Sequence, residues 1–352
     1  MARSRRSLGI LTPLFLLLSA AATWSFVWFY LSQEADARIT EALATASEKG
    51  WTLTCGNRAI RGFPFRLEFD CGQPELVSET TSERLTVTAQ RLLGVALIYN
   101  IKHVIVEVEG PTQVSTFKLG GERRALEVKT GSARASFELE DNGLAAVSFV
   151  ATEALSQIPA FGLLHQSRGS AFATERAALH IRKIDATTHD IALKFDNTKL
   201  EGELSSALFE SETLIAKTMD FVGQMKQSHA LFHRSPAPGL AAWQAAGGEM
   251  HVRHLIVDAP ALDIELSGVS TLDTWGRING KFKGVFGKLN QLITDLKARG
   301  VLNDDGARLA AGAIGLLARP TKDGSKAELP VKISGGDVFL GPIKAMVLPA
   351  LF

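Results

Sequence analysis

An uncharged segment near the N-terminus constrains this chain more than any other feature of its sequence. Residues 8–31 contain no charged side chain, and Arg3, Arg5 and Arg6 lie just before them. A helix of this length extends about 36 Å, enough to cross a hydrocarbon core of about 30 Å. Because basic residues favour the cytoplasmic side, the sequence predicts a transmembrane helix over residues 8–31 with its N-terminus in the cytoplasm.

Two details bear on whether this segment stays attached to the mature protein. Trp24, Trp28 and Tyr30 lie near its far end, where aromatic side chains favour the headgroup region. Residues 20–22 are three alanines and resemble the cleavage site of a signal peptide, which is the alternative. Cleavage there would leave a strongly apolar N-terminus. We therefore favour an uncleaved single-pass anchor in the inner (cytoplasmic) membrane, with the body in the periplasm.

The cysteine content agrees with an exported body. The chain has two cysteines, Cys55 and Cys71, and both follow the membrane segment. An even number of cysteines in an oxidising compartment predicts a disulfide. Closing a loop of this length is worth about 3 kcal/mol in the chain-entropy model. Two unpaired buried thiols are the alternative.

The charge distribution excludes one class of partner. The chain has a formal net charge of +1, and three of its arginines precede the membrane segment, so the exported part is close to neutral. Nucleic-acid binding depends on clustered lysine and arginine side chains. We therefore expect no nucleic acid among the partners.

Alternating apolar residues predict strands through the first half of the body. In residues 63–71 the odd positions are apolar, and Arg66, Glu68 and Asp70 stand between them, which is the period of a half-buried strand. Short strands separated by turns, with no helices between them, predict an antiparallel meander. The same alternation recurs in residues 104–108, 133–139 and 191–195, and turn signals lie at residues 109–111, 120–121 and 141–143.

The second half of the body mixes helical and strand patterns. The predicted helices cover residues 206–232, 240–246, 288–298 and 307–318, and the predicted strands cover residues 250–257, 262–266, 281–286, 329–340 and 343–347. The fold class is therefore α+β and predominantly β: a transmembrane helix, then a large curved antiparallel sheet with several helices in the C-terminal half. We divide the chain into a basic tip and anchor (1–32), a helical stalk (33–50), an antiparallel β-rich half (51–205) and a mixed α/β half that continues the same unit (206–352).

The sequence contains no recognisable catalytic, cofactor-binding or metal-ligating residues. His229 and His233 have the four-residue spacing of helical zinc ligands, but no glutamate stands between them to act as a general base. His251 and His254 lie in a predicted strand, where residues three apart point to opposite faces unless a bulge intervenes. We therefore expect a protein without cofactor or metal, and not an enzyme.

One short block is the strongest candidate for an interaction site. Residues 62–66 read Gly-Phe-Pro-Phe-Arg. In one interpretation Gly62 makes a turn, the proline starts a strand rigidly, and Phe63 and Phe65 enter the core. In the other interpretation Phe63 and Phe65 are exposed and, together with Arg66, contact lipid or a partner.

Several blocks together resemble a known family. They are Gly50-Trp51, Cys55, the block at 62–66, Cys71, the Ala-Trp-x-x-Ala-Gly-Gly block at 242–248 and the Gly-Asp-Val-Phe-Leu-Gly-Pro-Ile block at 336–343. With the preceding anchor, they resemble domain-of-unknown-function family 2125, a group of alphaproteobacterial membrane-anchored proteins. The resemblance implies an envelope location and one continuous unit, and the family supplies no activity. The strand start at residue 62 and the closing strand bear a looser fold-level likeness to AsmA-type envelope proteins.

Three functions fit these observations. The leading hypothesis is a non-enzymatic envelope protein whose sheet binds a lipid or another apolar ligand, or supports envelope assembly. The second is a structural or protein-interaction module with a fully packed sheet. The third is an unrecognised hydrolase, which would require clustered catalytic groups in a pocket. An open, apolar concave face would favour the first hypothesis.

Overall fold

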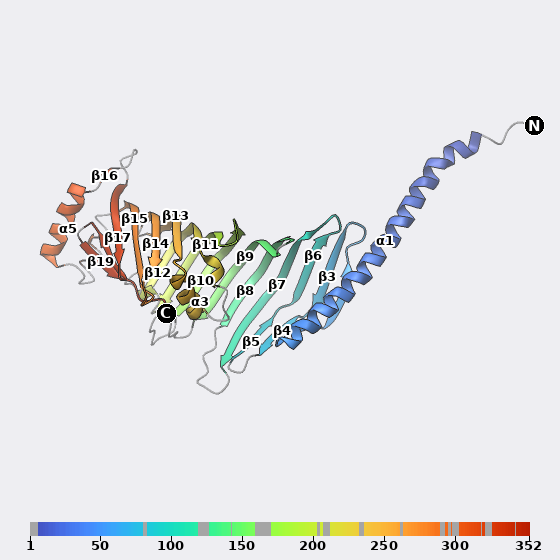
Figure 1. Ribbon diagram of the computed structural model, residues 1–352, viewed down its shortest axis with the longest axis horizontal. Coiled ribbons are helices and arrows are strands. Elements are labelled where there is room, and N and C mark those ends of the chain that lie inside the picture. Colours follow the sequence, from blue (N-terminus) through green and yellow to red (C-terminus); the bar gives the residue numbers. More distant parts are fainter. Residues whose placement is uncertain are drawn as a thin grey trace, which may run out of the picture.

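The computed structural model consists of one long N-terminal helix and one extended antiparallel sheet (Figure 1). It describes residues 6–79, 83–118, 127–141, 143–158, 170–202, 205–206, 212–231, 236–260, 263–288, 293–294, 297, 303–317, 319–320, 326–341 and 343–352. The predicted fold class is confirmed, because strands dominate and the apolar helix precedes them.

Helix α1 (Arg6–Glu48) is continuous, so the predicted membrane segment and the predicted stalk form a single helix. It ends as the sequence predicts, because Gly50 follows it with a φ of +85°, a conformation that glycine adopts readily after a helix. The shorter helices of the C-terminal half include η2 (Ser228–Leu231), α3 (Pro236–Ala245) and α5 (Asp304–Leu317), and residues 205–206, 293–294 and 297 are also helical.

The sheet takes strands from the whole chain after α1. The strands of the first half are β1 (Trp51–Thr54), β2 (Asn57–Arg61), β3 (Arg66–Gly72), β4 (Glu75–Glu79), β5 (Glu83–Thr88), β6 (Arg91–Leu97), β7 (Asn100–Lys118), β8 (Glu127–Glu140), β9 (Gly143–Ile158), β10 (Ser170–Lys183) and β11 (Thr188–Gly202). Those of the second half are β12 (Thr213–Lys226), β13 (Glu249–Asp258), β14 (Asp263–Leu272), β15 (Ile278–Gly287), β16 (Arg319–Pro320), β17 (Ala327–Ser334), β18 (Asp337–Leu340) and β19 (Ile343–Val347).

Strand β7 connects two arms at the N-terminal end of the sheet. Its first part pairs with β6, which pairs with β3 and then β2. Its second part pairs with β5, which pairs with β4 and then β1. From β7 to β15 each strand pairs with the next along the chain, and β17, β18 and β19 complete the sheet. This is the predicted meander, and it runs through both predicted halves of the body.

A line of irregular residues, which we call the crease, crosses six neighbouring strands. At these positions residues are left out of the register of pairs across neighbouring strands. They are Gly110-Pro111 of β7, Gly131 of β8, Glu153 of β9, Glu175 of β10, Asn197 of β11 and Lys217 of β12. Glu153 and Asn197 have positive φ values of 51° and 49°. A Cβ atom on Gly110 would lie 1.9 Å from the carbonyl oxygen of Gly131, so the backbones meet closely there. Such irregularities bend strands and increase their twist, and at the crease the alternation of side chains shifts by one residue.

The strand register places three apolar rows on one face of the sheet, which we call the apolar face. Residues paired directly across strands lie on the same face. The middle row is Phe69, Gly94, Val106, Ala135, Phe149, Leu179, Leu193, Phe221, Leu255, Leu266, Gly284 and Leu329. Two rows flank the middle row. The first consists of Cys71, Leu92, Val108, Ala133, Ala151, Ala177, Phe195, Met219, Val257, Ile264, Phe286 and Ala327. The second consists of Leu67, Ala96, Val104, Phe137, Val147, Ile181, Ile191, Gly223, Val252, Gly268, Phe282 and Val331.

No charged or hydrogen-bonding side chain interrupts these rows over twelve strands, a length of about 50 Å at the usual spacing between strands. The opposite face differs. One of its rows reads Asp70, Leu93, Glu107, Arg134, Val150, Ala178, Lys194, Asp220, Ile256, Glu265, Val285 and Glu328. Over these twelve strands one face is therefore apolar and the other mixes charged and apolar side chains.

The predicted helix over residues 206–232 is wrong in its central part. Residues 213–226 form strand β12, paired with β11 and β13. Leucine, alanine, methionine and lysine give this segment helical composition, but Leu214 and Ala216 alternate inward, as do Met219 and Phe221 beyond the crease. Pairing and burial in a sheet outweigh helix propensity, which is a weak preference. In the described part of the C-terminal half, helix accordingly occupies less of the chain than the sequence predicts.

The other predicted elements of the second half agree better with the structure. The short helix is α3, and the last predicted helix corresponds to α5. The predicted strands correspond to β13, β14, β15, β17, β18 and β19. Most of the predicted helix at 288–298 lies outside the described residues, as do the turn at 120–121 and residues 142 and 318.

Candidate functional site

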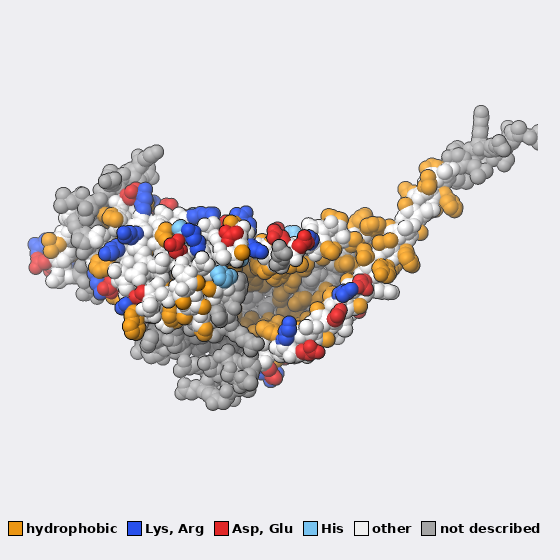
Figure 2. Space-filling view, viewed as in Figure 1, with side chains coloured by type: hydrophobic (Ala, Val, Ile, Leu, Met, Phe, Trp, Pro, Cys, Tyr) orange, Lys and Arg blue, Asp and Glu red, His pale blue; other side chains and the backbone are white. Residues whose placement is uncertain are grey.

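Among the described residues, the part of the apolar face on β6–β11 is open, and we call it the trough. Most of its side chains are half-buried, Ala151 is buried, and Phe149 in the middle row keeps 38% of its surface exposed. Figure 2 shows this region as a hollow in which hydrophobic side chains gather, beside α1. The half-buried side chains are Leu92, Val104, Val106, Val108, Phe137, Val147, Leu179, Ile181, Ile191, Leu193 and Phe195.

The same face is closed at the C-terminal end of the sheet. There Phe286, Leu329, Val331 and Val338 form a buried cluster, with Phe282 and other apolar side chains packed against it. Glycines let the rings lie close to the sheet: a Cβ atom on Gly284 would lie 2.4 Å from the Phe286 ring. The protein therefore fills this end of the apolar face with its own side chains.

Next to the trough, the apolar helix α1 contacts the turn between β2 and β3. The indole nitrogens of two α1 tryptophans donate hydrogen bonds to this turn: Trp24 Nε1 to the Pro64 carbonyl at 2.9 Å, and Trp28 Nε1 to the Arg66 carbonyl at 3.0 Å. The Phe65 ring lies 6.1 Å from that of Trp24. The Phe63 ring meets Trp28 edge-on at 5.5 Å. Trp28 is only 5% exposed, so the helix is firmly seated on the turn at this point.

The structure decides between the two placements of Phe63 and Phe65. Strand β3 begins at Arg66, and the preceding residues form a turn in which Gly62 has a φ of +102°. Phe63 and Phe65 are 52% and 61% exposed, so their predicted placement in the core is wrong. The physical reason is that the turn carries both rings off the end of the sheet and onto α1. Arg66 Nε pairs with Glu68 at 2.5 Å, and its side chain is also largely exposed. That these three residues contact lipid or a partner stays a prediction.

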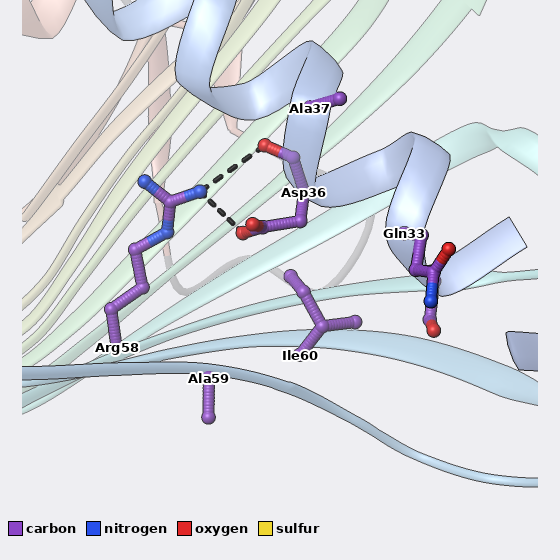
Figure 3. A pocket seen from close by; sticks show the side chains of 7 residues that line it. Gln33, Asp36, Ala37, Arg58, Ala59 and Ile60 are labelled. Atoms are coloured by element: carbon purple, nitrogen blue, oxygen red, sulfur yellow. Dashed lines mark hydrogen bonds and ion pairs between the residues drawn. The ribbon is translucent and has the colours of Figure 1, made fainter.

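Farther along α1, Arg58 attaches the helix to the edge of the sheet. Its Nη2 donates to the Asp36 backbone carbonyl at 3.1 Å and to Thr40 Oγ1 at 2.7 Å, and it also pairs with the Asp36 carboxylate. The guanidinium lies 5.7 Å above the centre of the Phe69 ring, the first residue of the middle row. Figure 3 shows Arg58 reaching across a small open cleft to Asp36, with Ile60 beneath. Polar contacts thus fix α1 beside the start of the trough.

The predicted disulfide between Cys55 and Cys71 is confirmed. The two Cα atoms lie 5.3 Å apart, and Cys71 is fully buried. The neighbouring Asp70 accepts hydrogen bonds from Arg91 Nε at 2.8 Å and Nη2 at 3.1 Å. These bonds, with the charge of Arg61 at 3.2 Å, lower the pKa of Asp70 against the opposing effect of burial. The disulfide, which reaches the apolar face at Cys71, and the ion pairs of Asp70 on the polar face together hold this end of the sheet.

The histidines do not form a metal site in the described part of the chain, where no group of three or more metal-ligating side chains occurs. The prediction that His251 and His254 point to opposite faces is wrong, because a bulge between Val252 and Leu255 brings both to the polar face. Each has its own carboxylate: His251 lies 2.8 Å from Glu249, and His254 lies 3.4 Å from Asp220. His229 lies in η2, and residue 233 lies outside the described residues.

The fold and the site define a class: a protein with one apolar helix, long enough to span a membrane, seated at the end of an open β-sheet that is apolar on one face. A family model described as an uncharacterised protein conserved in bacteria, DUF2125, matches residues 28–349. The chain belongs to this family, as its sequence blocks predict. No curated protein and no solved structure matches the chain.

The sequence leads to the hypothesis of an apolar binding face on the sheet, but it does not identify the residues that form the trough. The alternation inside single strands is visible in the sequence, for example in residues 104–108 and 191–195. The alignment of those strands is not, because strand register is set by turns and bulges that a single sequence does not specify. At the crease the alternation also shifts by one residue, so the pattern of apolar positions within a single strand does not show which residues beyond the crease lie on the same face.

Proposed function

We propose that this protein is a non-enzymatic, membrane-anchored envelope protein that holds the acyl chains of lipids in its trough. The observation that carries this proposal is the open, unbroken apolar surface on β6–β11 (Figure 2). Monomeric proteins seldom leave a large contiguous apolar surface uncovered unless it binds something. An acyl chain is the ligand whose shape fits a long, uniformly apolar surface without polar groups.

The energetics suit a ligand that is exchanged with a bilayer. Each methylene group removed from water contributes about 0.8 kcal/mol, so a chain of ordinary length would be held strongly against release into water. A chain that moves from a bilayer into the trough exchanges one apolar environment for another, at nearly constant free energy. A trough tethered to the membrane by α1 would therefore load and unload lipid readily while keeping it out of water.

The proposed location is the inner membrane, with a single pass, the N-terminus in the cytoplasm and the body in the periplasm. Arg3, Arg5 and Arg6 precede the apolar segment, which favours this orientation. The disulfide between Cys55 and Cys71 supports an oxidising compartment for the body. The partners in this proposal are the membrane, through residues 8–31, and lipid.

The packed C-terminal end favours a second role alongside the first. Its core around Phe286 and Leu329 is buried beneath the protein's own side chains. The sheet beyond the trough would then act as a structural or protein-interacting extension that supports envelope assembly.

The test compares substitutions at adjacent residues of β9 that point to opposite faces. The full-length protein is purified in mild detergent, and its lipid content per chain is measured by extraction and mass spectrometry. Phe149→Glu places a charge in the middle row between Ala135 and Leu179, and should remove lipid from the trough. Val150→Glu places the same charge on the polar face beside Arg134, and should leave lipid content unchanged.

The control variant also accounts for lipid that surrounds α1, since that lipid is the same in all three proteins. Circular dichroism melts confirm that both variants are folded. Equal lipid content in the wild type and in a folded Phe149→Glu variant would overturn the proposal.

A further inference from the structure

The tip of the sheet beside α1 consists of two adjacent turns. One is the turn before β3 with Phe63 and Phe65, and the other joins β6 to β7. The amide of Ile98 donates a hydrogen bond to the Phe65 carbonyl at 3.2 Å, so the two turns touch. Tyr99 in the second turn is 77% exposed. Three large aromatic side chains thus project from one small region.

The depth of this tip follows from the length of the helix. From Arg6 to Trp24, α1 extends about 27 Å, which is less than a hydrocarbon core of about 30 Å. When α1 spans a bilayer with its basic residues at the near surface, Trp24 therefore still lies within the far leaflet. Tilt of the helix would place it deeper.

The tip is held at the same depth as this tryptophan. The Trp24 indole donates to the Pro64 carbonyl at 2.9 Å, and its ring lies 6.1 Å from Phe65. One turn of helix farther on, Trp28 holds the Arg66 carbonyl at 3.0 Å. The predicted membrane segment ends at residue 31, so the sheet first contacts α1 within this segment and not after it.

We infer that this tip, formed by Phe63, Pro64, Phe65 and Tyr99, is immersed in the lipid leaflet from which α1 emerges. The occupant of the exposed aromatic surface is the bilayer itself, because that surface is continuous with the spanning helix: the Phe63 ring stacks 6.4 Å from the ring of Phe29 on α1, which is itself 59% exposed. Aromatic side chains are favoured at this level of a membrane. Arg61 and Arg66 are each paired with a carboxylate and remain largely exposed, which suits contact with lipid phosphates.

Immersion of the tip would bring the trough to the membrane surface. Phe69 and Leu67, which begin two of the three apolar rows, follow the tip directly along β3. Acyl chains would pass from the leaflet to the trough past the tip, without crossing water. This inference rests on the membrane anchor of the proposed function and adds the route by which lipid reaches its site.

The test measures the depth of nitroxide labels on the full-length protein in vesicles of phosphatidylethanolamine and phosphatidylglycerol. Single cysteines are introduced as Phe65→Cys and Tyr99→Cys under conditions that keep the native disulfide. Trp275→Cys, an exposed position in the turn before β15, is the matched control. Electron paramagnetic resonance then compares accessibility to oxygen, which concentrates in the bilayer, with accessibility to a water-soluble nickel complex.

The expected result is an oxygen-to-nickel accessibility ratio severalfold higher at Phe65→Cys and Tyr99→Cys than at Trp275→Cys. Equal ratios at all three positions would overturn the inference. Low accessibility to both reagents at the tip would also overturn it, because a protein partner would then cover the surface. Tyr99 serves as the second variant because its exposed side chain can be replaced without loss of packing.

The outcomes separate this inference from the proposed function. A tip accessible to nickel in a protein that still carries lipid in its trough would refute only the inference. An immersed tip on a protein without trough lipid would refute only the proposed function.

Discussion

The disulfide gives the most quantitative prediction, because it lies where the two arms of the sheet separate. Cys55 stands between β1 and β2, which belong to different arms, and it is bonded to Cys71 of β3. The substitution Cys55→Ala breaks the link and leaves Cys71 in place, so the packing around the buried Cys71 is kept. The loss should therefore appear as easier local opening of β2 and β3, while the rest of the sheet is unaffected.

The magnitude follows from the loop that the disulfide closes. For a sequence separation of 16 residues, the chain-entropy model gives about 3 kcal/mol. Since about 1.4 kcal/mol corresponds to a factor of ten, amide protection in the pairing between Ile60 and Phe69 should fall by about two orders of magnitude.

Hydrogen exchange with mass spectrometry measures this effect directly. Peptides from β2 and β3 should lose protection in Cys55→Ala and, equally, in the reduced wild-type protein. Peptides from β14 and β15 serve as the internal reference and should not change. Unchanged protection in β2 and β3, or an equal loss in β14 and β15, would refute the argument that the link acts locally through loop closure.

Three further predictions concern the close backbone contacts and the ion pairs of the sheet. Gly110→Ala should lower the melting temperature strongly, because its Cβ atom would lie 1.9 Å from the neighbouring strand. Gly94→Ala, whose Cβ atom would lie 3.5 Å from its nearest neighbour, should leave the melting temperature nearly unchanged. Equal melting temperatures for the two variants would contradict the close backbone contact at the crease. Gly284→Ala should cost about 1–3 kcal/mol in urea unfolding by overpacking the closed end of the apolar face, and an unaffected midpoint would show that this end is loosely packed. Asp70 has a pKa lowered chiefly by its hydrogen bonds from Arg91, so it stabilises the fold above its unfolded-state pKa of about 4. That contribution is lost as the pH falls through the lower folded-state pKa. Asp70→Asn should therefore cost about 1–3 kcal/mol at pH 7 and progressively less as the pH is lowered below about 4, and a loss that does not change with pH would contradict the assignment.

The parts of the structure that the sequence predicts are those with strong local signals. The uncharged segment predicts α1, and alternation predicts the strands around Val106 and Leu193. The pairing of Cys55 with Cys71 needs only an even count and an exported body. Each of these depends on residues near one another in the chain, or on composition alone.

The parts that it does not predict depend on contacts between distant residues. The three apolar rows exist because twelve strands share one register, and that register depends on bulges and turns. Strand β12 has helical composition, and its pairing with β11 and β13 decides its conformation. Similarly, His251 and His254 share a face because of a bulge that no local pattern indicates.

The placement of Phe63 and Phe65 shows a third kind of difficulty. Their alternation with Arg66 and Glu68 is that of a strand, yet β3 begins only at Arg66. The rings leave the sheet because two tryptophans of α1, about 40 residues earlier in the chain, bind the carbonyl groups of the turn. Exposure of both rings is one of the two interpretations that the sequence allows, but nothing in the sequence selects it over burial in the core.

Photo-cross-linking from two adjacent residues of β9 tests the central claim most directly. A benzophenone amino acid replaces Phe149, on the apolar face, or Val150, on the polar face, in the full-length protein in its native membrane. Irradiation followed by mass spectrometry identifies what is attached at each position. The account predicts lipid acyl chains attached at 149 and none at 150; equal lipid attachment at both positions, or none at 149, would contradict it.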